Sequence, residues 1–223
     1  MGSMIELKAN DGFTLAAYRA EPPGKPKGGL VVIQEIFGVN HHIRALTDRF
    51  AALGYAAVAP ALFDRAQRGV DIGYDPDAVK LGIDLRAKIE LADTLRDIAA
   101  AVAALGRAGK VGVIGYCWGG SLAFLSATRL DGVACAVGYY GGMIAAHADE
   151  QPKVPVLLHF GERDHGIPMT DVAKVIAARP DVTIFTYPAD HGFSCDERAS
   201  FDKPSHELAL QRSLAFLEDN LAN

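Results

Sequence analysis

Residues 115–120, Gly-Tyr-Cys-Trp-Gly-Gly, follow directly after the apolar run Val111–Ile114 and form the most informative stretch of the chain. A small residue stands two positions before and two positions after Cys117, which is the spacing around a nucleophile on a tight strand-to-helix turn. Such a turn strains the backbone of the central residue, and flanking glycines leave room for neighbouring backbone. The stretch therefore predicts a buried strand, a thiol nucleophile at the turn, and a helix. The alternative for Cys117 is an ordinary buried thiol at a helix start.

Two later strands each end in a residue that could serve Cys117. The apolar run Val154–Phe160 leads into a loop with Asp164, and Val182–Tyr187 leads into a loop with His191. An acid and then a histidine follow the nucleophile in enzymes with this turn, and open α/β sheets carry reactive groups at the carboxyl ends of their strands. We therefore predict a triad in which His191 takes the thiol proton and Asp164 orients the imidazole. Either residue alone would be interpreted as an ordinary polar side chain.

Length and composition fit one domain with a sizeable core, because the chain has 223 residues and is 50% hydrophobic. We expect residues 4–223 to form that domain and residues 1–3 to be a cloning remnant. The net charge of −5 without a basic run argues against nucleic-acid binding, and no apolar stretch is long enough to cross a membrane. Three cysteines without a signal-like segment predict free thiols in the cytoplasm, with a Cys117–Cys195 disulfide as the alternative. The predicted state is a monomer or small homo-oligomer.

Hydrophobic periodicity predicts strands that alternate with helices. The predicted strands are an antiparallel hairpin of 4–8 and 13–19 turning at 10–12, then 30–34, 55–59, 110–114, 133–139, 154–160 and 182–187. The predicted helices are 41–53 with Asn40 as N-cap, one long helix from Asp75 to Leu105, 118–129, 169–178, and a final helix capped by Ser205. The residues expected to face inward are Leu85, Ile89, Ala92, Leu95, Ala99, Val102 and Leu105 in the long helix and Leu210, Leu214, Leu217 and Leu221 in the last. The fold class is α/β, with a mostly parallel sheet between two helical layers.

With these motifs in this order, the chain resembles the dienelactone hydrolase family. The resemblance is carried by residues 34–40 (Gln-Glu-Ile-Phe-Gly-Val-Asn), 115–120, 136–141 (Ala-Val-Gly-Tyr-Tyr-Gly), 164–165 and 191–193, and it extends over about residues 5–220. It implies the α/β-hydrolase fold and hydrolysis of small lactones or esters of the kind produced in aromatic breakdown. It implies no cofactor. A metal site is not expected either, because the adjacent His41 and His42 would point in different directions on a helix.

The resemblance also implies roles for residues that the pattern alone does not explain. It places Glu35 beside the thiol, where the carboxylate could hold it neutral at rest and accept its proton when substrate binds. The alternative for Glu35 is a structural ion pair with Arg44 or Arg129. The backbone N–H groups of Ile36 and Trp118 are expected to form an oxyanion hole. The candidate pocket residues, each of which could equally be ordinary core, are Phe37, Tyr116, Tyr140, Phe193 and Cys195.

One departure from the family bears on the substrate. The family's best-known members carry an arginine four positions after the catalytic histidine and another early in the middle helix, and the two bind the substrate carboxylate. Here Cys195 stands at the first position, and residues 75–80 contain no arginine. Arg86 and Arg198 lie nearby, at unmatched positions. We therefore expect a weaker preference for a carboxylate-bearing dienelactone and relatively better use of neutral or larger esters and lactones.

Three functions fit the sequence. The first is a hydrolase of small esters or lactones that forms an acyl-thioester on Cys117. The second is a broad-specificity carboxylesterase. The third belongs to another class, a thiol redox sensor or ligand-binding protein on a hydrolase scaffold. Asp164 and His191 argue against the third function, because sensing needs only an accessible thiol of low pKa.

Overall fold

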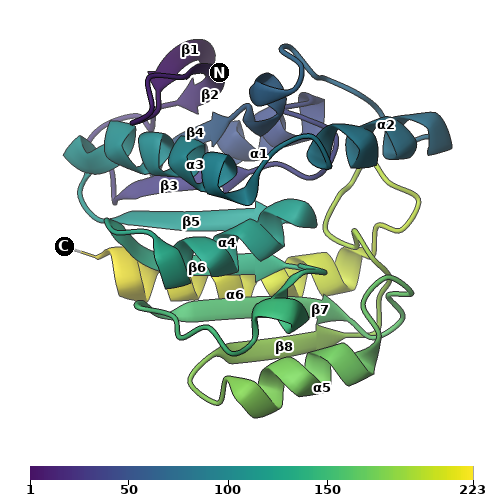
Figure 1. Cartoon of the computed structure of the whole chain (residues 1–223). Helices are drawn as coiled ribbons and strands as arrows, with labels where there is room; N and C mark the ends of the chain where they lie inside the picture. The colour runs from purple at the N-terminus through teal and green to yellow at the C-terminus, as the bar shows by residue number, and fades with distance from the viewer. Residues whose placement is uncertain (223) are drawn as a thin grey trace.

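Eight strands form one sheet in the order β1-β2-β4-β3-β5-β6-β7-β8 (Figure 1). The structure is a computed structural model that describes residues 1–222. The strands are β1 (Ser3–Lys8), β2 (Thr14–Ala20), β3 (Gly29–Ile33), β4 (Ala56–Pro60), β5 (Val111–Tyr116), β6 (Val133–Tyr139), β7 (Val156–Gly161) and β8 (Thr183–Tyr187). Pairs β1–β2 and β2–β4 are antiparallel, and every pair from β4 to β8 is parallel. The predicted fold class, with its N-terminal antiparallel hairpin, is confirmed.

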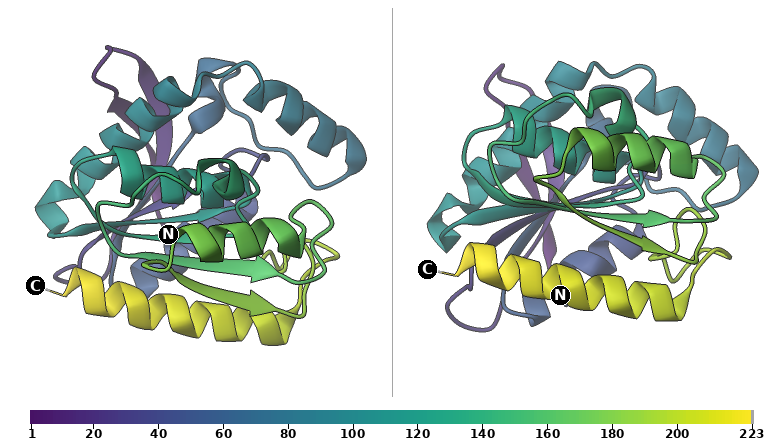
Figure 2. Two further views of the ribbon diagram at one scale, coloured as in Figure 1. Left: turned by 60° about the horizontal axis from the view of Figure 1, so that its bottom comes forward. Right: turned by 90° about the horizontal axis from the view of Figure 1, so that it is seen from below.

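Helices cover both faces of this sheet. They are α1 (His41–Ala52), α2 (Pro76–Arg86), α3 (Leu91–Leu105), α4 (Trp118–Arg129), α5 (Met169–Ala178) and α6 (Lys203–Leu221), with short 3-10 helices at Leu62–Arg65, Gly106–Ala108 and Ile144–His147. Figure 2 shows α1 and α6 on one face and α3, α4 and α5 on the other. Central strands β3 and β5 are therefore buried along their whole length, as their continuous apolar runs require. Within residues 1–222, no helix combines the length and apolarity needed to span a bilayer.

The parallel strands bring the chemically active residues to one edge of the sheet. Glu35 follows β3, Cys117 follows β5, Tyr140 follows β6, Asp164 follows β7 and His191 follows β8. All five strands point the same way, so these residues lie at neighbouring carboxyl ends. Figure 1 shows that α2 and the loop that precedes α6 come together at this same end. The sheet therefore brings residues that are far apart in the sequence together in one site.

The prediction of one helix from Asp75 to Leu105 is wrong. Helix α2 ends at Arg86, and a new helix α3 begins at Leu91. Helix α3 packs on β3 and β4, whereas Gly82 in α2 packs against the carbonyl of Ile36, beyond the end of β3. One straight helix cannot reach both places. Ala92, predicted to face inward, is exposed at the start of α3.

The last helix also differs from the prediction. It begins three residues earlier, and its N-cap is Asp202, whose carboxylate accepts a hydrogen bond from the N–H of Ser205 at 3.0 Å. The buried row of α6 contains Ala209, Ser213, Leu217 and Leu221, while Leu210 and Leu214 are only half-buried. The row is rotated because the Ser213 hydroxyl is hydrogen-bonded inside the core, 2.7 Å from Tyr139 Oη and 2.9 Å from His159 Nε2.

Candidate active site

Cys117 lies on the sharp turn between β5 and α4. Its backbone has φ +56° and ψ −116°, a left-handed region that a non-glycine residue adopts only under strain. The N–H of Cys117 donates to the carbonyl of Tyr139 at 3.0 Å, which fixes the turn on β6. A Cβ at Gly115 would lie 1.9 Å from the Gly119 carbonyl oxygen, and a Cβ at Gly119 would lie 2.5 Å from those of Ile33 and Gln34. Glycine at both flanks is therefore required for the turn to pack.

His191 connects Cys117 to Asp164. Its Nε2 lies 3.1 Å from Cys117 Sγ, and its Nδ1 lies 2.7 Å from Asp164 Oδ2. The other oxygen of Asp164 accepts hydrogen bonds from the N–H groups of Gly166 at 2.8 Å and Ile167 at 3.1 Å. Because these bonds fix the buried carboxylate, Asp164 in turn holds one orientation of the imidazole. The three side chains meet in the order that the sequence predicts.

The charge state of His191 depends on its two neighbours. Burial alone would lower its pKa, but the hydrogen bonds to Asp164 and Cys117 outweigh burial and raise the pKa of His191 to about 10. The imidazolium is therefore the favoured form at neutral pH. A positive charge 3.1 Å from sulfur stabilises a thiolate, the form of cysteine that acts as a nucleophile.

Two backbone N–H groups beside Cys117 are free to donate hydrogen bonds to a negatively charged oxygen of a substrate. Trp118 is the first residue of α4, where helix geometry leaves the N–H without an intrahelical acceptor. Ile36 follows β3, and within residues 1–222 its N–H has no hydrogen-bond acceptor. The carbonyl of Ile36 is packed against Gly82 of α2, where a Cβ would lie only 2.0 Å from the oxygen. Helix α2 therefore restrains the Ile36–Phe37 peptide, which follows directly after the peptide that carries the Ile36 N–H.

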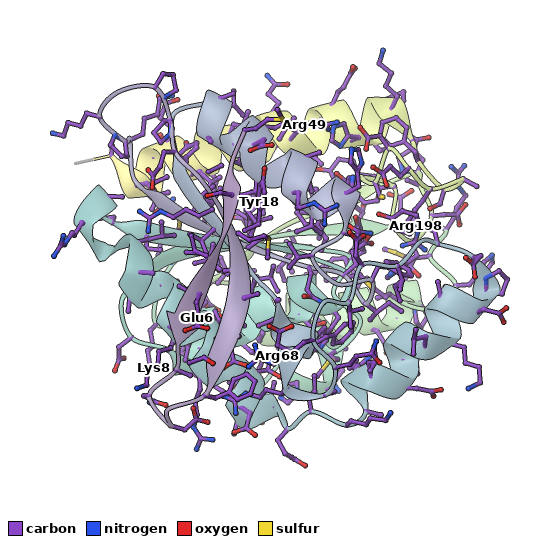
Figure 3. All side chains as sticks on the ribbon, turned by 90° about the horizontal axis from the view of Figure 1, so that it is seen from above. Glu6, Lys8, Tyr18, Arg49, Arg68 and Arg198 are labelled. Carbon is purple, nitrogen blue, oxygen red and sulfur yellow. The ribbon has the colours of Figure 1, made fainter. Side chains whose placement is uncertain are left out.

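Glu35 is buried and paired with Arg198 at 3.1 Å, between Oε1 and Nη1. The two partners that the sequence suggested for a structural pair are engaged elsewhere, Arg44 with Asp71 and Arg129 with Glu150. Arg198 lies on the loop before α6, and its guanidinium carbon is 5.7 Å from the ring centroid of Phe37. Figure 3 shows Arg198 at the end of the molecule where this loop approaches α2.

A cavity of about 540 Å³ contains the sulfur and the imidazole in its wall. Its lining residues are Ile36, Phe37, Val79, Ile83, Cys117, Asp164, His165, Gly166, Asp190, His191, Arg198 and Ser200. Six lining residues are not among those that the sequence predicts for the site: Val79, Ile83, His165, Gly166, Asp190 and Ser200. The i, i+4 spacing of Val79 and Ile83 gives α2 an apolar face and was the one available signal. Arg198 brings a cation into the cavity, although its sequence position matches neither of the two carboxylate-binding arginines of the family.

Several predicted residues lie outside the cavity wall. Of the pocket candidates, Phe37 lines the cavity, while Tyr116, Tyr140, Phe193 and Cys195 are buried in the core. All three cysteines are free, so the alternative of a Cys117–Cys195 disulfide is wrong.

The remaining charged candidates also lie elsewhere. Arg86 lines a different hollow, next to Trp118 and Met143. His41 is paired with Glu197 and His42 with Asp196. Among the described residues, no cluster of three or more His, Cys, Asp or Glu side chains could hold a metal ion.

Comparisons with known proteins identify the family of the chain. The family model described as the dienelactone hydrolase family matches residues 15–221. A carboxymethylenebutenolidase of Pseudomonas putida is 32% identical over 224 residues, which cover 96% of this chain and 94% of the relative. A crystal structure from Klebsiella pneumoniae subsp. pneumoniae MGH 78578, provisionally named a dienelactone hydrolase, is 31% identical with a TM-score of 0.85 and covers 96% of this chain and 98% of that chain.

A dienelactone hydrolase-like promiscuous phosphotriesterase from metagenomic libraries shares the fold at 20% identity, with a TM-score of 0.78. The family model and the relatives above 30% identity both extend over nearly the whole sequence. The chain is therefore a hydrolase that belongs to the dienelactone hydrolase family.

Proposed function

We propose that the protein hydrolyses small carboxylic esters or lactones through a covalent thioester on Cys117. The observation that carries this proposal is the position of His191, with one ring nitrogen 3.1 Å from the sulfur and the other 2.7 Å from a buried carboxylate. That arrangement activates a thiol and can return its proton to a leaving group. The cavity beside it is large enough for a small organic molecule.

The reaction has two halves, and each uses the same groups. The Cys117 thiolate attacks the carbonyl carbon, and the N–H groups of Ile36 and Trp118 stabilise the resulting oxyanion. The C–O bond to the alkoxide breaks, and protonated His191 donates its proton to that oxygen. Neutral His191 then takes a proton from water, whose hydroxide attacks the thioester. The C–S bond breaks, and the thiolate and imidazolium form again.

Glu35 is proposed to take part because Arg198, the one cation paired with it among residues 1–222, also lines the cavity. A substrate anion that reached Arg198 would compete with Glu35 for the guanidinium, since one guanidinium forms its strongest bidentate contact with a single carboxylate. Where Cys117 is still a neutral thiol, a released Glu35 could turn toward it, accept its proton before the attack, and return that proton to the sulfur after the C–S bond breaks.

The Glu35→Gln variant tests this role. Its kcat/KM should fall about 10- to 100-fold, because the amide cannot accept a thiol proton. The melting temperature should change little, since the amide oxygen still accepts from Arg198. Glu150→Gln is the matched control, because Glu150 also pairs with an arginine but neither residue lines the cavity. Full activity of Glu35→Gln at unchanged stability would remove Glu35 from the mechanism.

Arg198 changes the expectation for the substrate. The sequence predicted a pocket without the family's carboxylate-binding arginines, yet a guanidinium lines the cavity. We expect the wild type to use a lactone with a carboxylate better than its neutral counterpart. Arg198→Gln should lower that ratio of kcat/KM values about 10- to 100-fold, as for loss of a charged hydrogen bond.

Arg86→Gln is the matched control, because Arg86 lies in another hollow and should leave the ratio unchanged. The substrate panel also tests the proposed function as a whole. It contains p-nitrophenyl acetate, neutral esters and lactones, and their carboxylated counterparts. Turnover of simple esters without any turnover of lactones would favour the carboxylesterase alternative. A wild type that turned over none of these compounds would refute the proposal.

Gly82→Ala tests whether the contact between α2 and the Ile36 carbonyl helps to hold the neighbouring oxyanion-binding N–H group of Ile36 in place. Alanine normally favours a helix by about 1 kcal/mol over glycine, but here its Cβ would lie 2.0 Å from the Ile36 carbonyl oxygen. The Ile36–Phe37 peptide must shift and should displace the adjoining Glu35–Ile36 peptide with its N–H group, so kcat/KM should fall about 10- to 100-fold. Gly106→Ala is the control, because no atom lies within 4 Å of a Cβ there. Equal kcat/KM values for the wild type and Gly82→Ala would show that the peptide position does not limit the rate.

A further inference from the structure

Tyr140 combines a strained backbone with a hydroxyl group that lacks a partner. It follows β6 directly with φ +39°, and within residues 1–222 Cys117 is the other non-glycine residue with positive φ. Its side chain is fully buried, and among the described residues no group forms a hydrogen bond with its Oη. A strained conformation and a buried unpaired hydroxyl both cost stability, and such costs concentrate at functional sites.

The contacts of the Tyr140 ring do not explain why this position has a tyrosine, with its hydroxyl group, and not a phenylalanine. The ring centroid lies 5.1 Å from that of His191 and 5.4 Å from that of Phe193, and the N–H donates to the His159 carbonyl at 2.7 Å. Phenylalanine would keep every one of these contacts and would bury no polar atom. The hydroxyl therefore needs a partner that reaches it in some other state of the site.

Glu35 is the acceptor that suits this hydroxyl. Burial, followed by the charge of Glu35, raises the pKa of Tyr140 well above its ordinary value, so the hydroxyl keeps its proton and can donate. The other titratable groups near it are Tyr116, His191, Cys195 and Arg198. Arg198 cannot accept a hydrogen bond, and burial raises the pKa of Cys195 to about 12, which leaves a protonated thiol that accepts weakly. The Glu35 carboxylate is the strongest acceptor in the group.

We propose that Tyr140 is a positioning residue that receives Glu35 when the carboxylate leaves Arg198. Its hydroxyl donates to one oxygen of Glu35 and keeps its own proton, and the second oxygen of Glu35 remains free to face the Cys117 thiol. This inference rests on the proposed function, in which a substrate anion displaces Glu35 from Arg198. In the structure Glu35 lies on Arg198, which explains why the Tyr140 hydroxyl has no partner there.

Kinetics of Tyr140→Phe test the proposal. The expected result is a fall in kcat of about tenfold or more with little change in KM, because the lost hydrogen bond to a charged group forms only after substrate binds. The melting temperature should stay the same or rise. Tyr187→Phe is the control, because its buried hydroxyl is paired with His159 Nδ1 at 2.8 Å, so the melting temperature should fall and kcat should not. An unchanged kcat in Tyr140→Phe would overturn the proposal.

A double variant separates action through Glu35 from a general packing effect. In the Glu35→Gln background, adding Tyr140→Phe should change kcat by less than about twofold, because the charge-assisted bond is already absent. An independent tenfold loss in that background would show that Tyr140 acts on something other than Glu35.

A crystal structure of Arg198→Met provides a test that needs neither substrate nor turnover. Methionine removes the guanidinium but fills similar space, so Glu35 must find another partner. We expect one of its oxygens at about 2.7 Å from Tyr140 Oη. Glu35 in any other place would overturn the proposal. If the wild type hydrolysed no ester or lactone, the proposed function would fail, while this structure would still decide whether Tyr140 receives Glu35.

Discussion

The Cys117→Ala variant should lose at least about 10⁴-fold in kcat for any ester or lactone that the wild type hydrolyses. The sulfur is the only nucleophile on the turn between β5 and α4, and its loss leaves His191 with no group to activate. The fold should remain, because alanine fits the space of the thiol. The measurement is kcat on the wild-type substrates, together with a melting curve to show that the variant is folded.

Iodoacetamide supplies a second measurement of the same prediction. Cys117 is partly exposed in the cavity wall, whereas burial raises the pKa of both Cys135 and Cys195 to about 12. One label per chain should therefore appear, on Cys117, and activity should disappear in proportion. Cys135→Ala is the matched control and should keep the wild-type rate and labelling. A fully labelled protein that still turned over substrate would exclude the thiol as nucleophile. Cys117→Ser should also fall far below the wild type, because a hydroxyl is much harder to ionise.

The second large effect is expected from His191→Gln, with a loss close to that of Cys117→Ala. Members of a catalytic unit are strongly non-additive, so the double variant should be no slower than either single one. Asp164→Asn should also lose activity, because it disturbs the imidazole orientation set by the 2.7 Å bond to Asp164 Oδ2. The measurement is kcat for the two single variants and the double variant. A His191→Gln variant within tenfold of the wild type would contradict the triad.

Stability against pH offers a check on His191 without any substrate. Its pKa is raised from 6.5 to about 10 in the folded protein, with Asp164 and Cys117 outweighing the effect of burial. A group with a raised folded pKa stabilises the fold fully below its unfolded pKa, and this contribution is lost as the pH rises through the folded value. The difference in melting temperature between wild type and His191→Gln should therefore be largest below about pH 6.5 and should shrink toward pH 10. A difference independent of pH would contradict the raised pKa.

Sequence patterns alone predicted the strands and the candidate triad. Local rules were sufficient, because apolar runs with flanking glycines mark buried strands, and parallel strands must place Cys117, Asp164 and His191 at one edge. The turn at Cys117 was predictable for the same reason, since only glycine fits beside it at positions 115 and 119.

The break between α2 and α3 could not be predicted from the sequence. Residues 87–90, Ala-Lys-Ile-Glu, contain neither glycine nor proline, and hydrophobic spacing continues across them. The helix ends because the packing of Gly82 on Ile36 and the packing of α3 on β3 and β4 require different directions. Packing also determined which face of α6 is buried: Leu217 and Leu221 are buried as predicted, while Ala209 and Ser213 take the places expected for Leu210 and Leu214.

Only the tertiary structure placed Arg198 in the cavity and Tyr140 beside His191. Arg198 is 163 residues from Glu35 in the sequence and lies on an irregular loop, where no periodicity indicates the direction of a side chain. Tyr140 was one aromatic residue among several candidates, and its unpaired hydroxyl exists only after β6, the loop before α6 and the Glu35–Arg198 pair have come together. Periodicity and turn residues act over a few positions, so they determine strands and turns. The partner of a buried charge or hydroxyl depends on which loops the finished sheet brings together.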